Sequence, residues 1–411
     1  MSLFTLSPFQ KLQMCGTEEE MREVAGRICR NYLHGAWKTV DPTELNFRRI
    51  SGGLSNFLYY VALPDDTSQL YPHREMSPED PATSFAMDEP KKFYRSTLPF
   101  FFQVLLRIYG QVHGERAMDA IVTESVIFTL LSERRLGPKL HGVFSGGRIE
   151  EYIPARPLLT KELADPSLSM KIAEKMAAIH SMDVPLSKEP NWIWKTMGKW
   201  LKTIREERLS GNITGKVSYP TNIINVKFLT SVESPVVFCH NDMQEGRPPS
   251  SDANSDPQLR RKFRLPAQTH LSDSGEPKLV LIDFEYCAYN YRGFDIANHF
   301  QEWGYDYTNP QHPFYFENQE NCPNIEQKVR DFAVSLEAVN KLLNEVDAFA
   351  CASHLFWALW SIINASKSQI PFGYWEYGQS RLETYLRLKQ EVIKKDKFGL
   401  AQKRKICEVD I

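Results

Sequence analysis

The chain has 411 residues, of which 42% are hydrophobic, so it is long enough to bury a large core in two to three domains or lobes. The formal net charge of −2 excludes the strong field of one sign that binding to nucleic acid or to a membrane surface would use. Seven cysteines without zinc or redox spacing, and an N-terminus without a secretory signal pattern, predict reduced thiols in a cytoplasmic protein.

The first part of the chain combines two helical patterns with several strand patterns. Residues 18–36 and 118–133 carry apolar side chains at helical spacing. The expected strands are residues 47–50, 57–63, 104–109 and 147–154. The first two of these strands flank a short glycine turn, which predicts a hairpin.

The second part of the chain is mostly helical. Two short apolar strands, 235–239 and 279–282, interrupt the helical pattern. The most apolar stretch, 348–363, is shorter than a membrane span and predicts a buried core helix. The sequence therefore predicts an α+β protein with two lobes, a β-rich one over residues 1–155 and a mostly helical one over residues 156–411.

Two acidic motifs carry the strongest chemical signal, because each directly follows one of the apolar strands. The first is Phe238-Cys-His-Asn-Asp242 and the second is Leu281-Ile-Asp-Phe-Glu285. Phosphoryl transfer from ATP needs one carboxylate to accept the proton of the acceptor hydroxyl and another to hold the Mg²⁺ that bridges the phosphates. Either motif alone is most often a set of turn residues, but the ordered pair favours a phosphotransferase with Asp242 and Asp283 in these two roles.

The first part of the chain offers groups that could contact nucleotide phosphates. The glycine turn consists of Ser51, Gly52, Gly53, Leu54, Ser55 and Asn56. Its backbone N–H groups could cover the phosphates, although most glycine turns between strands are only turns. Arg107 lies inside an apolar strand, where a cation needs a partner or a ligand, and Glu124 on the following helix is the expected partner. A solvated Arg107 on an edge strand is the alternative.

Aromatic side chains gather in the last third of the chain. Trp357 and Trp360 are three residues apart, so they share one face of the predicted helix. Aromatic rings beside a carboxylate suit a quaternary ammonium group, whose charge is held by cation–π attraction without hydrogen bonds. Spacing alone favours ordinary core packing of these tryptophans instead.

Several longer segments resemble the choline kinases. They are Ser51–Asn56, Val104–Gly110, Cys239-His-Asn-Asp-Met-Gln-Glu-Gly246, Ile282-Asp-Phe-Glu-Tyr286, Tyr289-Asn-Tyr-Arg-Gly-Phe-Asp295, His299-Phe-Gln-Glu-Trp303 and the tryptophan pair. The resemblance extends over nearly the whole chain, from about residue 20 to about residue 385. It implies a protein-kinase-like two-lobed fold, ATP with Mg²⁺, and the first step of phosphatidylcholine synthesis.

The resemblance also implies roles for single residues. Asp242 would accept the choline proton, Asp283 would hold Mg²⁺ with Glu285 close by, and Arg107 would contact the ATP phosphates. The other expected nucleotide contacts are the glycine turn, Glu124, Glu151, Tyr152 and Ile153. The expected choline pocket consists of Tyr286, Glu302, Tyr307, Trp357, Trp360 and Tyr377. Ethanolamine kinases are near relatives, so ethanolamine is a candidate second substrate, and the family implies a homodimer or a heterodimer with a related subunit.

The sequence departs from the family pattern directly after the catalytic motif. The family has an asparagine, the second Mg²⁺ ligand, five residues after the catalytic aspartate, and an apolar strand follows it. Here that position is Arg247, and we expect the polar segment 247–278 to be a disordered insertion. A cation would repel Mg²⁺, and the missing strand would leave 279–282 without its ladder. A catalytically impaired dimer partner is therefore the second hypothesis, and an aminoglycoside-type phosphotransferase is the third.

Residues 93–103 form a second departure, because they split a stretch that the family writes continuously. Their last residues, Leu-Pro-Phe-Phe-Phe-Gln, are what a pyrimidine-rich intron end followed by CAG would encode. We hypothesise that this segment and 247–278 are retained or mispredicted intron sequence, or belong to a variant isoform. Transcript reads across the junctions test this hypothesis, and clean inclusion of both segments in an abundant message would count against it.

Overall fold

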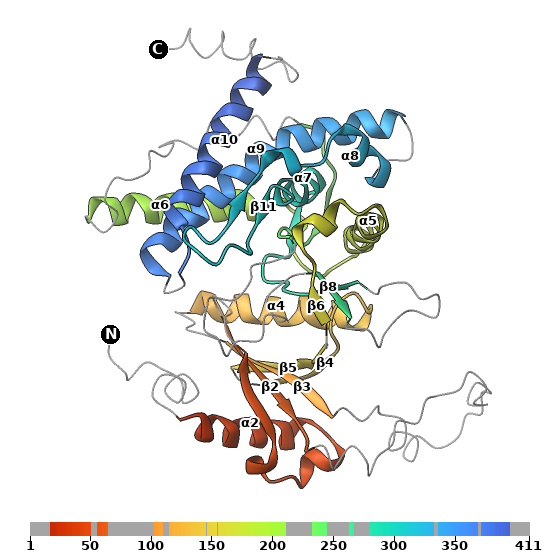
Figure 1. The fold of residues 1–411 in the computed structure, drawn as a ribbon, viewed down its shortest axis with the longest axis vertical. Helices are drawn as coiled ribbons and strands as arrows, with labels where there is room; N and C mark the ends of the chain where they lie inside the picture. The colour runs from red at the N-terminus through yellow and green to blue at the C-terminus, as the bar shows by residue number, and fades with distance from the viewer. Residues whose placement is uncertain are drawn as a thin grey trace, which may run out of the picture. The chain divides into compact units, whose positions relative to one another are not determined.

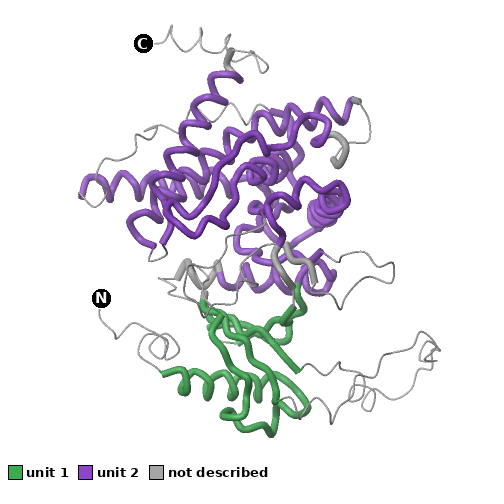
Figure 2. Tube along the Cα trace, in the orientation of Figure 1, with its two compact units in different colours: residues 1–119, 138–153 green, residues 120–137, 154–411 purple. Residues whose placement is uncertain are grey.

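The computed structural model describes residues 17–50, 56–64, 102–109, 115–144, 146–153, 155–210, 232–244, 263–266, 279–332, 336–368 and 371–394. The chain divides into two compact units (Figure 2). The first comprises residues 1–119 and 138–153, and the second comprises residues 120–137 and 154–411. The sequence-based division placed all of residues 1–155 in one lobe, whereas residues 120–137 group with the helical unit.

The first unit is built on a five-stranded antiparallel sheet with the order β1-β2-β3-β5-β4. The strands are β1 (Asn46–Ile50), β2 (Asn56–Ala62), β3 (Gln103–Tyr109), β4 (Leu140–Phe144) and β5 (Gly147–Glu151). The four strands that the sequence indicated in this part are confirmed. Strand β4, which the pattern did not indicate, forms one edge of the sheet.

Helix α2 (Glu18–Tyr32) packs its apolar face on this sheet (Figure 1). It begins with a capping box, in which the Thr17 hydroxyl accepts a hydrogen bond from the Glu20 N–H and the Glu20 carboxylate accepts one from the Thr17 N–H. Two short 3₁₀ helices, η2 (Gly35–Lys38) and η3 (Pro42–Glu44), follow it. The helix therefore supplies the buried layer that a sheet with one apolar face requires.

The second unit is mostly helical, as the sequence predicted. Its helices are α4 (Glu115–Glu133) from residue 120 on, η5 (Thr160–Ala164), α5 (Pro166–His180), α6 (Trp192–Leu209), α7 (Arg292–Glu302), η8 (Gln319–Asn321), α8 (Ile325–Phe332), α9 (Leu336–Lys367) and α10 (Tyr374–Lys394). Helix α9 packs against α6, α7, α8 and α10. It contains the apolar stretch that the sequence assigned to a core helix, and the residues in the middle of that stretch are buried.

Helix α9 is longer than the apolar stretch suggested. Among the described residues, α9 is the helix whose length and composition would be enough to cross a membrane. The expectation that this region is too short for a membrane span considered only residues 348–363, which are part of the longer helix. However, 83% of its most apolar window is buried inside the protein. A core helix of a folded protein has this property, because its apolar side chains already have protein partners.

Short strands in the second unit carry the two acidic motifs. They are β6 (Ala155–Pro157), β7 (Val236–Cys239), β8 (Phe263–Pro266), β9 (Val280–Leu281), β10 (Ala288–Tyr291), β11 (Tyr305–Asp306) and β12 (Phe316–Glu317). β7 pairs with β10, and β8 lies between β6 and β9. These pairings place the ends of β7 and β9, where the acidic motifs begin, in the same unit.

Strand β8 corrects the expectation that residues 279–282 have lost their partner. Phe263 pairs with Leu281, and Arg264 pairs with Val280. A ladder uses backbone N–H and C=O groups, so an extended segment of quite different sequence can replace the family's apolar strand. The rest of the segment 247–278, including Arg247, lies outside the described residues, as do residues 93–101 of the other departure.

Two glycines of the fold make a matched test of packing. A Cβ at Gly147, the first residue of β5, would lie 2.2 Å from the carbonyl oxygen of Arg107, whereas one at Gly198 in α6 would meet nothing within 4 Å. We expect Gly147→Ala to lower the free energy of unfolding by about 2 kcal/mol or more, because the backbone must move. Gly198→Ala should raise it by roughly 0.5–1 kcal/mol through helix propensity. Urea unfolding of both variants measures the difference, and equal effects would contradict the packing described for β5.

Candidate active site

The first acidic motif forms a tight, buried turn at the end of β7. Asn241 has a φ of 66°, in the left-handed region, and Asp242 is 2% exposed. The Asp295 carboxylate on α7 accepts hydrogen bonds from the backbone N–H of His240 at 3.1 Å and from that of Asn241 at 2.8 Å. A carboxylate on a rigid helix thus holds the strained backbone that presents Asp242.

Asp295 is itself fixed by a third partner, because its Oδ2 lies 2.8 Å from Nε2 of His180. Burial opposes ionisation of this carboxyl group, but the hydrogen bond and charge of His180 and the charge of His240 hold its pKa below the ordinary value. Burial and the neighbouring Asp295 raise the pKa of the Cys239 thiol well above its usual range. Asp295 is therefore an ionised anchor beside a neutral thiol.

His180, Cys239 and Asp295 are also the group of three potential metal ligands found in the described part of the chain, within 4.8 Å of one another. Two of the three residues have partners outside the cluster. Asp295 also accepts hydrogen bonds from the backbone N–H groups of His240 and Asn241, and the Cys239 thiol contacts backbone carbonyl groups of β7 and β10. We therefore interpret this cluster as a structural anchor of residues 240–242, named the catalytic turn for the predicted role of Asp242.

Hydrogen bonds join the first acidic motif to the second. The Asn241 side chain donates to the carbonyl oxygen of Tyr286 at 2.9 Å, and Nε2 of His240 lies 3.4 Å from the carbonyl oxygen of Ile282. Asp283, between these two contact points, has a φ of 68°. The structure thus places Asp242 and Asp283 on two turns that contact each other directly, as the paired-carboxylate hypothesis requires.

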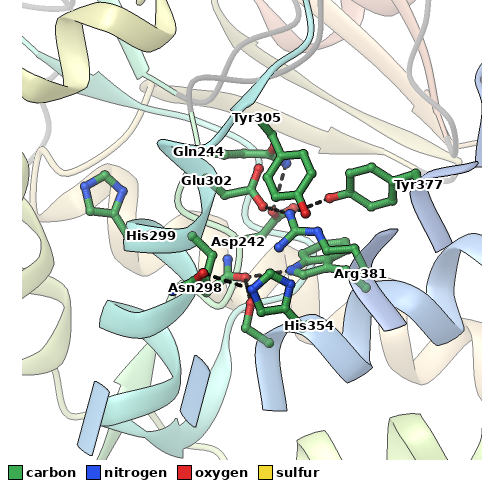
Figure 3. Close-up of polar contacts among 12 residues, drawn as sticks. Asp242, Gln244, Asn298, His299, Glu302, Tyr305, His354, Tyr377 and Arg381 are labelled. Atoms are coloured by element: carbon green, nitrogen blue, oxygen red, sulfur yellow. Dashed lines mark hydrogen bonds and ion pairs between the residues drawn. The ribbon is translucent and has the colours of Figure 1, made fainter. Parts of the chain in front are cut away.

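The Asp242 carboxylate has a partner that the sequence analysis missed. Nε2 of Gln244 donates to Asp242 Oδ1 at 2.9 Å (Figure 3). One turn further along α7 from Asp295, Nδ1 of His299 contacts the carbonyl oxygen of Met243 at 3.1 Å. Helix α7 therefore supports the catalytic turn at two successive positions, and Gln244 orients the carboxylate.

The second motif has the donor chemistry for a hard divalent cation. Asp283 is half-buried and Glu285 is exposed, and both offer carboxylate oxygens. Mg²⁺ is commonly held by one or two protein carboxylates together with water and substrate phosphates. These residues therefore fit a magnesium site of that open kind.

Three of the predicted pocket residues form one ring cluster. The ring centroids of Tyr286 and Trp357 are 5.8 Å apart, and those of Trp357 and Trp360 are 5.6 Å apart. This confirms that the two tryptophans share a face of α9. Nε1 of Trp357 donates to Oδ1 of Asn298 at 2.6 Å, which fixes the central ring of the cluster against α7.

The other three predicted pocket residues form a polar cluster around a buried arginine. The Tyr307 hydroxyl donates to Glu302 Oε2 at 2.8 Å and lies 3.0 Å from the Tyr377 hydroxyl. Arg381 on α10 forms an ion pair with Glu302 and donates to the Tyr377 hydroxyl at 2.6 Å (Figure 3). Burial and the Glu302 charge raise the pKa of Tyr307 well above its ordinary value, so its hydroxyl remains a donor.

The two clusters lie close together. The Trp360 ring packs on Tyr374 at 5.7 Å, and Phe372 packs on both Tyr374 and Tyr377, at 5.0 and 5.4 Å. All six predicted pocket residues are therefore brought into one region of the second unit. Glu302 is also paired with a cation, because Arg381 neutralises its charge.

Arg107, which is predicted to contact the nucleotide, lies in the sheet of the first unit. Nε of Arg107 on β3 lies 2.7 Å from Oε1 of Glu150 on β5, and the buried Arg148 contacts the same oxygen at 2.7 Å. Glu150 is thus the ion-pair partner that the sequence analysis missed. Glu124 belongs to the other unit, and its pairing with Arg107 stays a prediction.

The remaining nucleotide candidates lie at the edges of what the structure describes. Tyr152 accepts a hydrogen bond from Arg48 at 3.2 Å, and the Glu151 carboxylate accepts one from the Lys139 N–H at 2.9 Å. Ile153 follows these two residues and is half-buried. Asn56 begins β2, and residues 51–55 of the glycine turn lie outside the described residues.

Comparisons with known proteins show which family this chain resembles. Residues 47–386 match the model of the choline/ethanolamine kinase family. A human choline/ethanolamine kinase is 41% identical, with 89% of this chain and 85% of the relative covered. A mouse choline kinase alpha is 37% identical (91% and 82% covered), and a probable ethanolamine kinase of Arabidopsis thaliana is 30% identical (88% and 84% covered).

Solved structures show the same fold at lower sequence identity. A choline kinase of Cryptosporidium parvum superposes with a TM-score of 0.64 at 23% identity, with 92% of this chain and 98% of that chain covered. An ethanolamine kinase of Plasmodium vivax superposes with a TM-score of 0.60 at 20% identity, with 92% of each chain covered. Together with the family match and the phosphotransfer motifs, these findings show that the chain belongs to the choline/ethanolamine kinase family of phosphotransferases.

Proposed function

We propose that this protein transfers the γ-phosphate of ATP to the hydroxyl of choline, with Mg²⁺, as the first step of phosphatidylcholine synthesis. The observation that carries the proposal is the position of the ring cluster Tyr286–Trp357–Trp360 beside the turn that presents Asp242, since Asn241 donates to the carbonyl of Tyr286 itself. Aromatic rings hold a trimethylammonium group, and the hydroxyl of so short a substrate must then lie near the catalytic turn.

Asp242 would act as the general base. As the choline oxygen attacks the γ-phosphorus and the bond to the bridging oxygen of ADP breaks, the hydroxyl proton passes to the Asp242 carboxylate. Gln244 holds one oxygen of that carboxylate, and Asp295 holds the backbone of the turn. Asp283 and Glu285 would hold Mg²⁺, which neutralises negative charge on the phosphates. Arg107 would contact the phosphates from its own unit.

Ethanolamine is the second candidate substrate, because relatives named as ethanolamine kinases match most of the chain. The ring cluster favours choline, since a quaternary ammonium gains cation–π attraction without needing acceptors. The alternative is that the protein is a catalytically impaired dimer partner, because Arg247 stands where the family has a metal-ligating asparagine. We also propose that the protein is a dimer and that it lies in the cytoplasm. Light scattering of the purified protein tests the oligomeric state.

Arg247→Asn tests the proposed function and its metal requirement together. The partner strand β8 is present, so the variant keeps the whole chain and restores only the expected ligand. In a coupled assay with choline and ATP–Mg²⁺ we expect low turnover of the unsubstituted protein and an increase in kcat of at least about tenfold in the variant, because a cation no longer repels Mg²⁺.

Arg260→Asn is the matched control, since it removes a positive charge from the same segment at a position that the family pattern does not assign to a metal ligand. It should therefore leave kcat within about twofold. Equal kcat in the unsubstituted protein and the Arg247→Asn variant would contradict the assignment of position 247. Absence of phosphocholine in every variant, with choline still bound, would favour the impaired dimer partner.

A further inference from the structure

The starting point is that both oxygens of Glu302 are occupied by protein groups. Oε1 pairs with Nη2 of Arg381, and Oε2 accepts the hydroxyl of Tyr307 at 2.8 Å. Glu302 lies seven residues after Asp295 on α7, so the two residues are on the same face of the helix, with their Cα atoms about 10.5 Å apart along its axis. Both oxygens of Glu302 are thus engaged by Arg381 and Tyr307.

The Arg381 guanidinium lies over two tyrosine rings, where it makes cation–π contacts. Its guanidinium carbon is 3.9 Å from the ring centroid of Tyr305 and 4.9 Å from that of Tyr377. The side chain is fully buried, with 0% exposure. An arginine that pairs with a carboxylate and stacks on rings leaves Glu302 and Arg381 together with no net charge.

The rings of Tyr286, Trp357 and Trp360 are among the pocket rings that Arg381 does not stack on, and they form the ring cluster. Trp360 is half-buried, so part of its ring faces solvent, whereas Trp357 is 5% exposed. A quaternary ammonium carries no N–H and gains attraction from such rings alone. A primary ammonium has three N–H donors that lose water on entering, and it needs acceptors that a paired Glu302 does not supply.

We propose that Arg381 is the specificity-determining residue of this pocket, because it neutralises Glu302 and so reserves the ring cluster Tyr286–Trp357–Trp360 for a quaternary ammonium over a primary one. The inference rests on the proposed function, since it concerns the amine pocket of that same reaction. Arg381 is a positioning residue in this account. It acts on the substrate through Glu302 and does not touch the substrate.

Calorimetric titration of choline and of ethanolamine, without ATP, tests the inference independently of turnover. Four variants are compared with the unsubstituted protein: Glu302→Gln, Arg381→Met, Arg381→Lys and the double variant Glu302→Gln/Arg381→Met. Glu302→Gln leaves a buried cation beside the pocket, so the choline Kd should rise at least about 30-fold. The double variant restores neutrality, and its choline Kd should return to within about fivefold of the original.

Arg381→Met frees the Glu302 carboxylate as an acceptor for a primary ammonium. The ratio of the ethanolamine Kd to the choline Kd should fall at least about tenfold, whereas Arg381→Lys, which keeps the charge, should hold the ratio within about threefold. Thermal unfolding shows which variants are folded. If Arg381→Met does not fold, the neutral double variant and Arg381→Lys decide the question.

A double variant that loses choline binding as severely as Glu302→Gln would overturn the inference, because Glu302 would then contact the ammonium directly. Unchanged amine preference in folded Arg381→Met would overturn it as well. Failure of the unsubstituted protein to bind either amine would remove the proposed function together with this inference. Normal choline binding combined with either of the first two results would remove the inference alone.

Discussion

Asp242→Asn should lower kcat for choline phosphorylation by about 10³-fold and leave the KM for choline nearly unchanged. The variant keeps the shape of the side chain and its contact with Gln244, but an amide cannot accept the hydroxyl proton, and a positioned general base contributes about 10²–10⁴-fold. The measurement is steady-state kinetics in the Arg247→Asn background, where turnover is expected to be high enough to detect a large loss.

Glu337→Gln serves as the control for this prediction. Glu337 is an exposed carboxylate on α9 that pairs with Lys341, away from the catalytic turn. Its substitution should change kcat by less than about twofold, because exposed ion pairs contribute little. A loss of less than about tenfold in Asp242→Asn would contradict the assignment of Asp242 as the base.

Asp295→Asn should lower kcat by at least about 100-fold and the free energy of unfolding by about 3 kcal/mol. The ionised carboxylate holds two backbone N–H groups of the catalytic turn and the ring of His180, and removing one partner of a buried charged pair costs about 3–5 kcal/mol. Misplacing a base by a fraction of an ångström reduces turnover even when it is chemically intact. Kinetics and urea unfolding of the same preparation measure both effects.

The pH dependence of stability gives a second test of Asp295. Its pKa in the folded protein lies below the ordinary value of 3.8, so its contribution is complete above about pH 4 and is lost as the pH falls through the lowered pKa. The stability difference between the protein and Asp295→Asn should therefore shrink as the pH falls below about 4. A difference that grows as the pH falls below about 4 would contradict an ionised Asp295.

His180→Gln separates the two duties of Asp295. It removes the ring that contacts Asp295 but keeps both backbone hydrogen bonds to the catalytic turn. We expect the loss of kcat to be at least about tenfold smaller than the loss in Asp295→Asn, because the turn stays anchored. Equal losses would mean that the ring, and not the carboxylate, positions Asp242.

The sequence predicted those parts of the site that depend on local pattern. The acidic motifs follow apolar strands, so their positions at strand ends could be predicted. The three-residue spacing of Trp357 and Trp360 was enough to place both rings on one helix face. The strand-rich and helix-rich parts followed from periodicity in the same way. These features require only neighbours along the chain.

Pairings between distant segments of the chain could not be predicted from local sequence patterns. Glu150 is 43 residues from Arg107 and meets it because β3 pairs with β5, a pairing that no local pattern indicates. The pairing of Arg107 with Glu124, expected by analogy with a helix partner, stays a prediction. Arg381 is 79 residues from Glu302. Its one local signal is its position four residues after Tyr377, which places an arginine on the buried face of α10.

Strand β8 shows a different limit of sequence reasoning. The segment around Phe263–Pro266 has a polar composition, and composition does not reveal that four residues can complete a ladder between β6 and β9. Backbone hydrogen bonding is nearly independent of side-chain identity, so a short strand can occur in a segment with little apolar periodicity. The expected loss of the strand was therefore wrong, while the assignment of Arg247 stays a prediction.

Product analysis by phosphorus NMR tests the role of Asp242 when the Arg247→Asn protein, and separately the Arg247→Asn/Asp242→Asn double variant, has been incubated with choline and ATP–Mg²⁺. We expect phosphocholine that increases with the amount of the Arg247→Asn protein, and none above the buffer background with the double variant. Phosphocholine formed at the same rate by both proteins would show that Asp242 is not the base, and the proposed mechanism would have to be abandoned.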